Sequence, residues 1–421
     1  MKLFASILAL IFLALPLLAL EPSDTLFEGG ERPTSPADTL RSFSTLYSPL
    51  STLEAPRPAG KWWLSADLLS FFKDNEWDGT IAKGYTLPGL RLRPTLHYQV
   101  HPQVEVSAGA EVLIYHGAHA FPNYAFHDIA HWKGHQYQAG AHIVPIVRTK
   151  VDLGSAQLVL GSIYGGLHHD LVEPLYHREL QLSADPELGA QFRIARQRWA
   201  MDLWIDWQSF IFEFDNHQEA FTMGMTQRFD LVRRPDEGFT LSLPLAMVAQ
   251  HRGGEQDRAE LNLGVQTLVN ASVGLRARWQ RPAGWLRAWQ LEGHLLAAYQ
   301  KDGQLWPFDG GLGGWLAASA QLGRHWHVGL GAFRTERFVS LYGSPFFGTL
   351  SSKHEGARFD GMTTLRWSAE YLRPIGRRCL VGATLDGYVT SQGRLTHPDG
   401  STEPASVGNA FSFGVVVRVA I

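Results

Sequence analysis

From Lys61 to the C-terminus, the chain consists of segments with a period of two, joined by connections that are alternately short and long. In the last segment, NAFSFGVVVRVAI, every second residue from Phe411 to Ile421 is apolar, which is the pattern of a β-strand with one apolar face. The segment LNLGVQTLVNASVGLRARW keeps the same alternation over residues 261–279. Strands of globular sheets usually have about three to ten residues, so a longer one favours a tilted strand that crosses a bilayer.

Extending this interpretation along the chain predicts about sixteen strands. Their approximate centres are Leu68, Leu92, Ala108, Ala141, Leu160, Phe192, Leu203, Met225, Leu243, Val269, Leu291, Ala317, Leu330, Leu365, Ala383 and Val415. The short connections lie near residues 100, 150, 195, 233, 280, 323 and 373. The long ones are 73–86, 116–135, 165–186, 213–219, 251–260, 301–310, 338–357 and 391–408.

The alternation of connection lengths predicts an all-β fold, a transmembrane antiparallel up-and-down β-barrel with short periplasmic turns and long extracellular loops. The physical reason for closure is that hydrocarbon cannot satisfy the backbone groups of an unpaired strand edge. A secreted soluble β-protein is the alternative, but it does not explain why the connections alternate. A chain of 421 residues would otherwise suggest two or three soluble domains.

The N-terminus, MKLFASILALIFLALPLLALEPSD, has a lysine, a short apolar run and a small residue before a polar stretch. This pattern predicts a signal peptide over residues 1–19, cleaved after Ala19, with an uncleaved anchor as the alternative. Residues 20–60 are rich in Pro, Ser and Thr and are predicted to form a periplasmic arm or a small hatch in the lumen. Residues 61–421 form the predicted barrel, which places the protein in the outer membrane.

Composition excludes one class of partner and one kind of cross-link. The formal net charge is -3 and only 18% of the residues are charged, so no polybasic surface for nucleic acid is predicted. Cys379 is the single cysteine, so no internal disulfide can form.

The barrel segment resembles the porin-like outer-membrane β-barrels of Gram-negative bacteria. Four of its stretches, GYTLPG, LVEPLYH, HQEAF and SPFFG, are similar to those of a group of such barrels to which no function is assigned. The chain ends in Ile421, whereas many such barrels end in Phe or Trp. The resemblance implies fold and location, and it leaves a homo-oligomer possible.

If the apolar faces meet lipid, the alternating faces point into the lumen, where charges of both signs are predicted. These lumen charges are Arg91, Arg93, Glu105, Glu111, Arg193, Asp202, Asp206, Arg276, Arg278, Arg366 and Glu370. About sixteen strands leave an aqueous channel unless loops fold inward. We therefore predict a porin-like channel for passive passage of small polar solutes, with loops 116–135 and 165–186 as its constriction or cap.

The histidines of two exterior loops suggest a different function. In the stretch YHGAHAFPNYAFHDIAHWKGHQ, His127 and His131 are spaced as on one face of a helix, and His168 and His169 lie in the next long loop. Neighbouring loops at a barrel rim could bring these imidazoles together as ligands for zinc, copper or nickel. An outer-membrane binding protein that captures a ligand or a metal is therefore the alternative to a channel.

Catalysis is the third possibility. An esterase would need a serine within hydrogen-bond reach of a histidine that a third group orients. No nucleophile-elbow, zinc-protease or phosphate-loop motif occurs in the sequence. The sequence therefore predicts a protein that is not an enzyme and has no cofactor, with outer-membrane lipid and small solutes as its partners.

Overall fold

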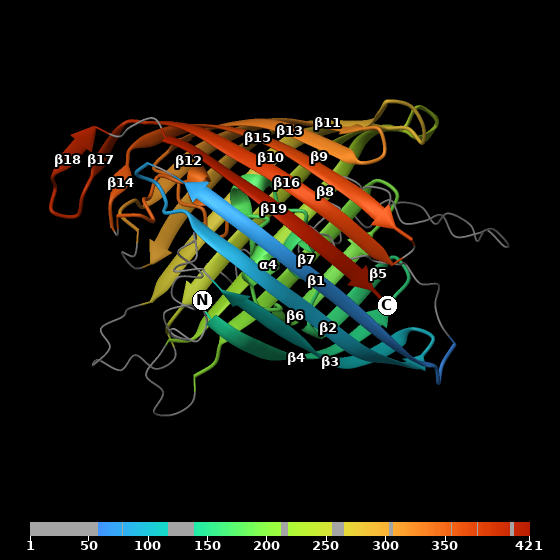
Figure 1. The fold of residues 1–421 in the computed structure, drawn as a ribbon. Coiled ribbons are helices and arrows are strands. Elements are labelled where there is room, and N and C mark those ends of the chain that lie inside the picture. Colours follow the sequence, from blue (N-terminus) through green and yellow to red (C-terminus); the bar gives the residue numbers. More distant parts are fainter. Residues whose placement is uncertain are drawn as a thin grey trace. The chain divides into compact units, whose positions relative to one another are not determined.

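The fold was analysed in a computed structural model that describes residues 58–77, 79–116, 139–211, 218–254, 265–302, 306–354, 356–376, 378–404 and 408–421. Sixteen antiparallel strands of this part form a closed barrel, in which β1 pairs with both β2 and β19 (Figure 1). The predicted signal peptide and most of the predicted arm lie outside the described residues.

Each of the sixteen predicted strand centres falls within a barrel strand. The strands are β1 (Trp62–Trp77), β2 (Tyr85–His101), β3 (Val104–His116), β4 (Ala139–Asp152), β5 (Ala156–Ser162), β6 (Leu188–Ala195), β7 (Trp199–Ser209), β8 (Ala220–Arg234), β9 (Phe239–Arg252), β10 (Gln266–Gln280), β11 (Leu286–Asp302), β12 (Gly310–Leu322), β13 (Trp326–Glu336), β15 (Gly361–Ile375), β16 (Cys379–Gln392) and β19 (Gly408–Ala420). The prediction of a transmembrane barrel with about sixteen strands is confirmed.

The two faces of each strand differ as the alternation predicts. In β19, Phe411, Phe413 and Val415 are exposed, whereas Ser412 and Arg418 are buried. An outward apolar face and a polar inward face are what a bilayer on one side and a lumen on the other require. Among the described residues, no helix is both long enough and apolar enough to span a membrane.

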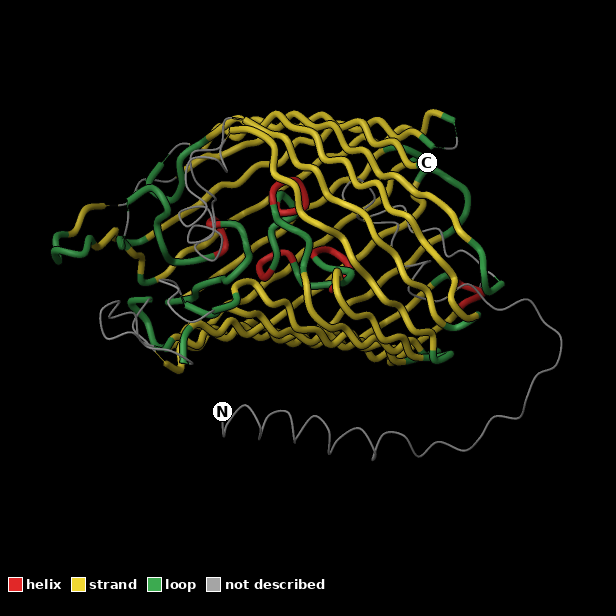
Figure 2. Tube along the Cα trace, turned by 90° about the horizontal axis from the view of Figure 1, so that it is seen from below, coloured by secondary structure: helices red, strands yellow, loops and turns green. Residues whose placement is uncertain are grey.

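The connections are short at one end of the barrel, the short-turn end, and long at the other, the long-loop end. Two long connections turn back into the lumen, and their short helices lie among the strands in Figure 2. The first, residues 163–187, contains η3 (Gly166–His169), η4 (Glu173–Leu175) and α4 (Leu180–Ser183). The second, residues 337–360, contains η6 (Pro345–Phe347) and β14 (Arg358–Phe359).

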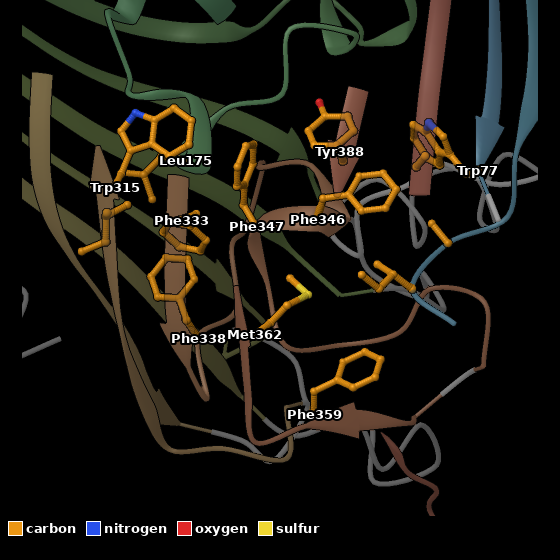
Figure 3. Close-up of a cluster of buried hydrophobic side chains, with 14 of the residues drawn as sticks. Trp77, Leu175, Trp315, Phe333, Phe338, Phe346, Phe347, Phe359, Met362 and Tyr388 are labelled. Atoms are coloured by element: carbon orange, nitrogen blue, oxygen red, sulfur yellow. The ribbon is translucent and has the colours of Figure 1, made fainter. Parts of the chain in front are cut away.

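The second inward loop builds an apolar core inside the barrel. Phe346 and Phe347 are buried against Trp315 of β12, Phe333 of β13 and Tyr388 of β16 (Figure 3). Aromatic rings in such edge-to-face and stacked contacts contribute both burial and specific geometry. The loop is therefore fixed to the inner wall.

Two elements lie outside the barrel wall. The strands β17 (Arg394–Thr396) and β18 (Thr402–Pro404) join β14 in a three-stranded sheet at the long-loop end. A 3-10 helix, η5 (Pro235–Glu237), forms one of the short turns. The sequence pattern did not predict the small sheet, because its strands have only two or three residues each.

Candidate functional site

Three neighbouring strands bring a serine, a histidine and a glutamate into one hydrogen-bonded row. Ser65 Oγ of β1 lies 2.9 Å from His97 Nε2 of β2, and His97 Nδ1 lies 2.9 Å from Glu105 Oε1 of β3. An ionised carboxylate can only accept, so Nδ1 of His97 donates to Glu105 when Glu105 is charged. Nε2 of the neutral ring then accepts the Ser65 hydroxyl proton, which is the arrangement of a nucleophile, a base and an orienting group.

The strand alternation explains why these three side chains meet. Leu64 and Leu96 are exposed on the outer face, so Ser65 and His97 point inward. Trp63 is directly opposite His97 across the β1–β2 pair, and Glu105 is opposite Gln99 across the β2–β3 pair. The three residues therefore lie on one inward patch near the short-turn end, which we call the Ser65 triad.

Two further contacts hold the triad in place. The second carboxylate oxygen of Glu105 accepts a hydrogen bond from Lys150 Nζ of β4. The Trp63 ring stacks on the His97 ring, with 4.9 Å between centroids and 2° between planes. The His97 side chain is 13% exposed, so the ring is held firmly and remains open to solvent on part of its surface.

A second histidine forms part of the first inward loop. His169 Nδ1 lies 2.9 Å from Asp202 Oδ2 of β7, and His169 Nε2 lies 2.8 Å from Glu187 Oε2. Its ring stacks on Trp204 of β7, with 3.5 Å between centroids. Burial alone would lower the pKa of His169, but Glu187 and Asp202 outweigh it and raise that pKa to about 9. Because both ring nitrogens are engaged, His169 anchors the loop.

Three more ion pairs tie the first inward loop to other strands of the wall. Glu179 lies 2.8 Å from Lys73 of β1, Glu173 lies 2.8 Å from Arg366 of β15, and Asp170 lies 3.0 Å from Arg276 of β10. Together with the contact of His169 with β7, these pairs give the loop four anchors on strands spread around the barrel, and Asp185 adds a contact of 2.8 Å with His142 of β4. We call residues 163–187 the plug loop.

Glu179 is a buried carboxylate whose charge is balanced by Lys73. Burial would raise the pKa of Glu179, but the charge of Lys73 and hydrogen bonds from Lys73 and Tyr85 lower it to about 2. Asn75 also donates to Glu179, over 3.0 Å. Burial lowers the pKa of His177 to about 4, so this ring is neutral at physiological pH. The plug loop therefore presents a stable carboxylate to β1.

Several of the predicted lumen charges take part in these networks. Arg276 and Arg366 bind the plug loop, Asp202 binds His169, and Arg93 donates to Glu111 over 2.6 Å. The remaining members of the predicted set are Arg91, Glu105, Arg193, Asp206, Arg278 and Glu370.

Loop 165–186, predicted as a constriction or cap, lies in the lumen, whereas most of loop 116–135 falls outside the described residues.

The predicted metal ligands are not assembled in the described part of the chain. His127 and His131 lie outside the described residues, and His168 packs edge-on against Tyr164. Within the described ranges, no group of three or more His, Cys, Asp or Glu side chains could hold a metal ion. A metal site that uses His127 and His131 stays a prediction.

The closed strand order and the apolar outer face define an outer-membrane β-barrel. Residues 54–420 match the model of the lipid A 3'-O-deacylase-type family, and the chain belongs to that family. No curated protein sequence matches the chain significantly.

Several solved barrels are similar to this chain in structure. The outer membrane protein OprD from Pseudomonas aeruginosa is 8% identical, with 85% of this chain and 94% of that chain covered and a TM-score of 0.47. OccK1 from the same organism is 10% identical, with 85% and 99% covered and a TM-score of 0.46. OmpT, an outer membrane protein of Vibrio cholerae, is 9% identical, with 86% and 100% covered and a TM-score of 0.43.

The family match corrects one prediction from the sequence. The absence of a short catalytic motif led to the prediction that the protein is not an enzyme, and membership in a deacylase-type family shows that this prediction is wrong. No short sequence motif contains the Ser65 triad, because its three residues come from three strands. The one available signal was that Ser65, His97 and Glu105 occupy inward positions on consecutive predicted strands.

Proposed function

We propose that this protein is an outer-membrane acyl-ester hydrolase in which Ser65 is the nucleophile. The observation that carries the proposal is the pair of 2.9 Å contacts that link Ser65 to His97 and His97 to Glu105. The family name supports the same bond class, because a 3'-O-deacylase cleaves an ester between an acyl chain and a sugar hydroxyl.

The chemistry follows from the roles of the three side chains. Ser65 Oγ attacks the ester carbonyl carbon while its proton passes to His97 Nε2. The tetrahedral intermediate expels the alcohol oxygen, which takes that proton from His97 and leaves an acyl group on Ser65. A water molecule that gives its proton to His97 then attacks the acyl-serine, and the fatty acid leaves as Ser65 regains its proton. Glu105 stabilises the imidazolium in both steps.

The position of the triad favours one route for the substrate. Ser65 and His97 lie near the short-turn end. The plug loop contacts the wall further along, at Arg91 of β2, which is opposite Leu69 of β1, and at Lys73 of β1. Leu69 is four and Lys73 eight residues from Ser65, which corresponds to roughly 14 and 27 Å along the strand. We propose that an acylated amphiphile enters the lumen from the short-turn end and places its ester beside Ser65. The prediction that short turns are periplasmic would then give the enzyme access to esters on that side of the outer membrane.

The test is hydrolysis of a short-chain ester by the purified protein in detergent. We expect turnover of p-nitrophenyl hexanoate by the wild type, and a loss of at least about 100-fold in kcat/KM in Ser65→Ala. Ser70→Ala is the matched control, because Ser70 lies on the same strand and on its outer face. Mass spectrometry of envelope lipids incubated with both variants would identify the ester that is cleaved. Equal activity of the two variants, or no turnover by the wild type, would overturn the proposal.

Passive passage of small polar solutes is the second candidate. It is supported by the charges of both signs on the inward faces, which favour polar solutes in an aqueous lumen. The plug loop and the aromatic core of the second inward loop oppose it, because both occupy the lumen. Discrete conductance steps of the wild type in planar bilayers would support the channel, and their absence would remove it.

A further inference from the structure

Three arginines gather on the inward face beside the Ser65 triad. Arg93 of β2 is opposite Asp67 of β1, whereas Arg91 of β2 and Arg418 of β19 flank Leu69 of β1 from either side. Strand neighbours are about 5 Å apart, so the three guanidinium groups share one patch of the wall.

The carboxylates of this patch neutralise two of the three arginines. Arg418 donates to both oxygens of Asp67, over 2.7 and 2.8 Å, and Arg93 donates to Glu111. Arg91 is 6% exposed and donates to the backbone carbonyl of Gln181 in the plug loop. Among the described residues no carboxylate is hydrogen bonded to Arg91, so three positive and two negative charges leave a net charge of +1 on the patch.

A buried arginine without a carboxylate partner is costly unless another anion supplies the missing charge. The patch is reachable, because the Arg93 side chain is 32% exposed and the Asp67 side chain is 22% exposed. A guanidinium group offers a planar set of donors that matches the oxygens of a phosphate or a carboxylate. The patch therefore has the charge and the donors of an anion site.

The strand geometry sets the distance from this patch to the nucleophile. Asp67 is two residues and Leu69 four residues from Ser65 on β1, which corresponds to roughly 7 and 14 Å along the strand. An anion on the patch would thus lie several bonds from an ester carbonyl at Ser65.

We propose that the arginine patch of Arg91, Arg93 and Arg418 binds an anionic group of the substrate, a phosphate or a carboxylate, several bonds from the ester that Ser65 attacks. The position of the ester in this proposal rests on the proposed function, in which Ser65 is the nucleophile. Binding of the anion does not depend on that function and requires only the three arginines.

A pair of matched esters tests the assignment. Dihexanoyl phosphatidic acid and dihexanoylglycerol carry the same esters and differ in the phosphate. We expect the wild type to prefer the phosphatidic acid by at least about tenfold in kcat/KM, and Arg91→Gln to bring that preference close to one. Arg91→Lys should keep part of it, because the charge remains. Arg278→Gln is the control, since Arg278 is a lumen arginine of β10, on the opposite side of the barrel, and should leave the preference unchanged.

Calorimetry with Ser65→Ala separates the two proposals, because this variant binds the ester without cleaving it. We expect dihexanoyl phosphatidic acid to bind Ser65→Ala at least about tenfold more tightly than it binds Ser65→Ala combined with Arg91→Gln. Heat-modifiable migration in gels would verify that each variant forms a barrel, and Arg93→Gln, which also removes one positive charge of the patch, replaces Arg91→Gln if the latter does not. Binding without turnover by the wild type would overturn the proposed function and keep the anion site. Turnover of both esters with equal kcat/KM, or equal binding by the two variants, would overturn the anion site alone.

Discussion

The rings of Trp63 and His97 lie parallel, 2° apart in plane and 4.9 Å between centroids, on neighbouring strands of the barrel. This stacking fixes the plane in which His97 can meet Ser65 on one side and Glu105 on the other. Trp63 is thus a positioning residue for the proposed base, and it does not itself touch the reacting atoms.

Trp63→Leu is expected to lower kcat on p-nitrophenyl hexanoate about tenfold and to change KM little, because the variant frees the His97 ring to rotate. Trp63→Phe should restore much of the rate, since it keeps an aromatic surface. The control is Trp62→Leu, which removes a tryptophan from the outer face, where it stacks on Tyr98. The same rate in Trp63→Leu and Trp62→Leu would show that the stacking does not orient the base.

Replacing His169 should release the plug loop from β7. His169→Ala leaves Asp202 and Glu187 without their shared cation, and breaking a buried ion pair in this way costs about 3–5 kcal/mol. We expect a lower unfolding temperature and faster proteolysis within residues 163–187. His168→Ala is the control, because its ring packs on Tyr164 in the same helix region. Planar-bilayer recordings on both variants would also show whether release of the loop creates a conducting lumen.

The stabilisation that His169 provides should decrease as the pH rises. The pKa of His169 is about 9 in the folded protein, above its ordinary value of 6.5, because Glu187 and Asp202 outweigh burial. The stabilisation, on the order of 3 kcal/mol, is therefore fully present below about pH 6.5 and is lost as the pH rises through 9. The difference in unfolding temperature between the wild type and His169→Gln should narrow from pH 6 to pH 10. A constant difference over this range would contradict the charged state of His169.

Substitutions at two glycines test how tightly the Trp204 ring, on which His169 stacks, packs against the barrel wall. A Cβ atom at Gly224 of β8 would lie 2.0 Å from the Trp204 ring, which is the surface on which His169 stacks, whereas a Cβ atom at Gly314 of β12 would meet nothing within 4 Å. Gly224→Ala should displace Trp204 and destabilise the protein by about 1–3 kcal/mol. Gly314→Ala should change the unfolding temperature little. Equal unfolding temperatures for the two variants would contradict the tight contact between Gly224 and Trp204.

The strands could be predicted from the sequence because bilayer and lumen impose opposite polarities on alternate residues, as at Phe413 and Ser412. The inward folding of two long loops could not be predicted from the sequence, because a loop has no regular alternation of apolar and polar residues. The pair His168 and His169 suggested a metal, yet His169 binds carboxylates from β7 and from Glu187. Likewise Phe346 and Phe347 lie in a loop, and only the folded chain brings them against Trp315 and Tyr388.

The four anchors of the plug loop also constrain the order in which the protein can assemble. Glu179 needs Lys73 of the first strand, whereas Glu173 needs Arg366 of β15, which the ribosome delivers long after the loop itself. Until β15 has joined the wall, Glu173 has no cation at that anchor and must stay hydrated. Formation of the Glu173 anchor therefore has to follow the addition of β15 to the wall. In a chain truncated before β15, the plug loop would thus keep its contacts with β1, β7 and β10 and lose the one with Arg366.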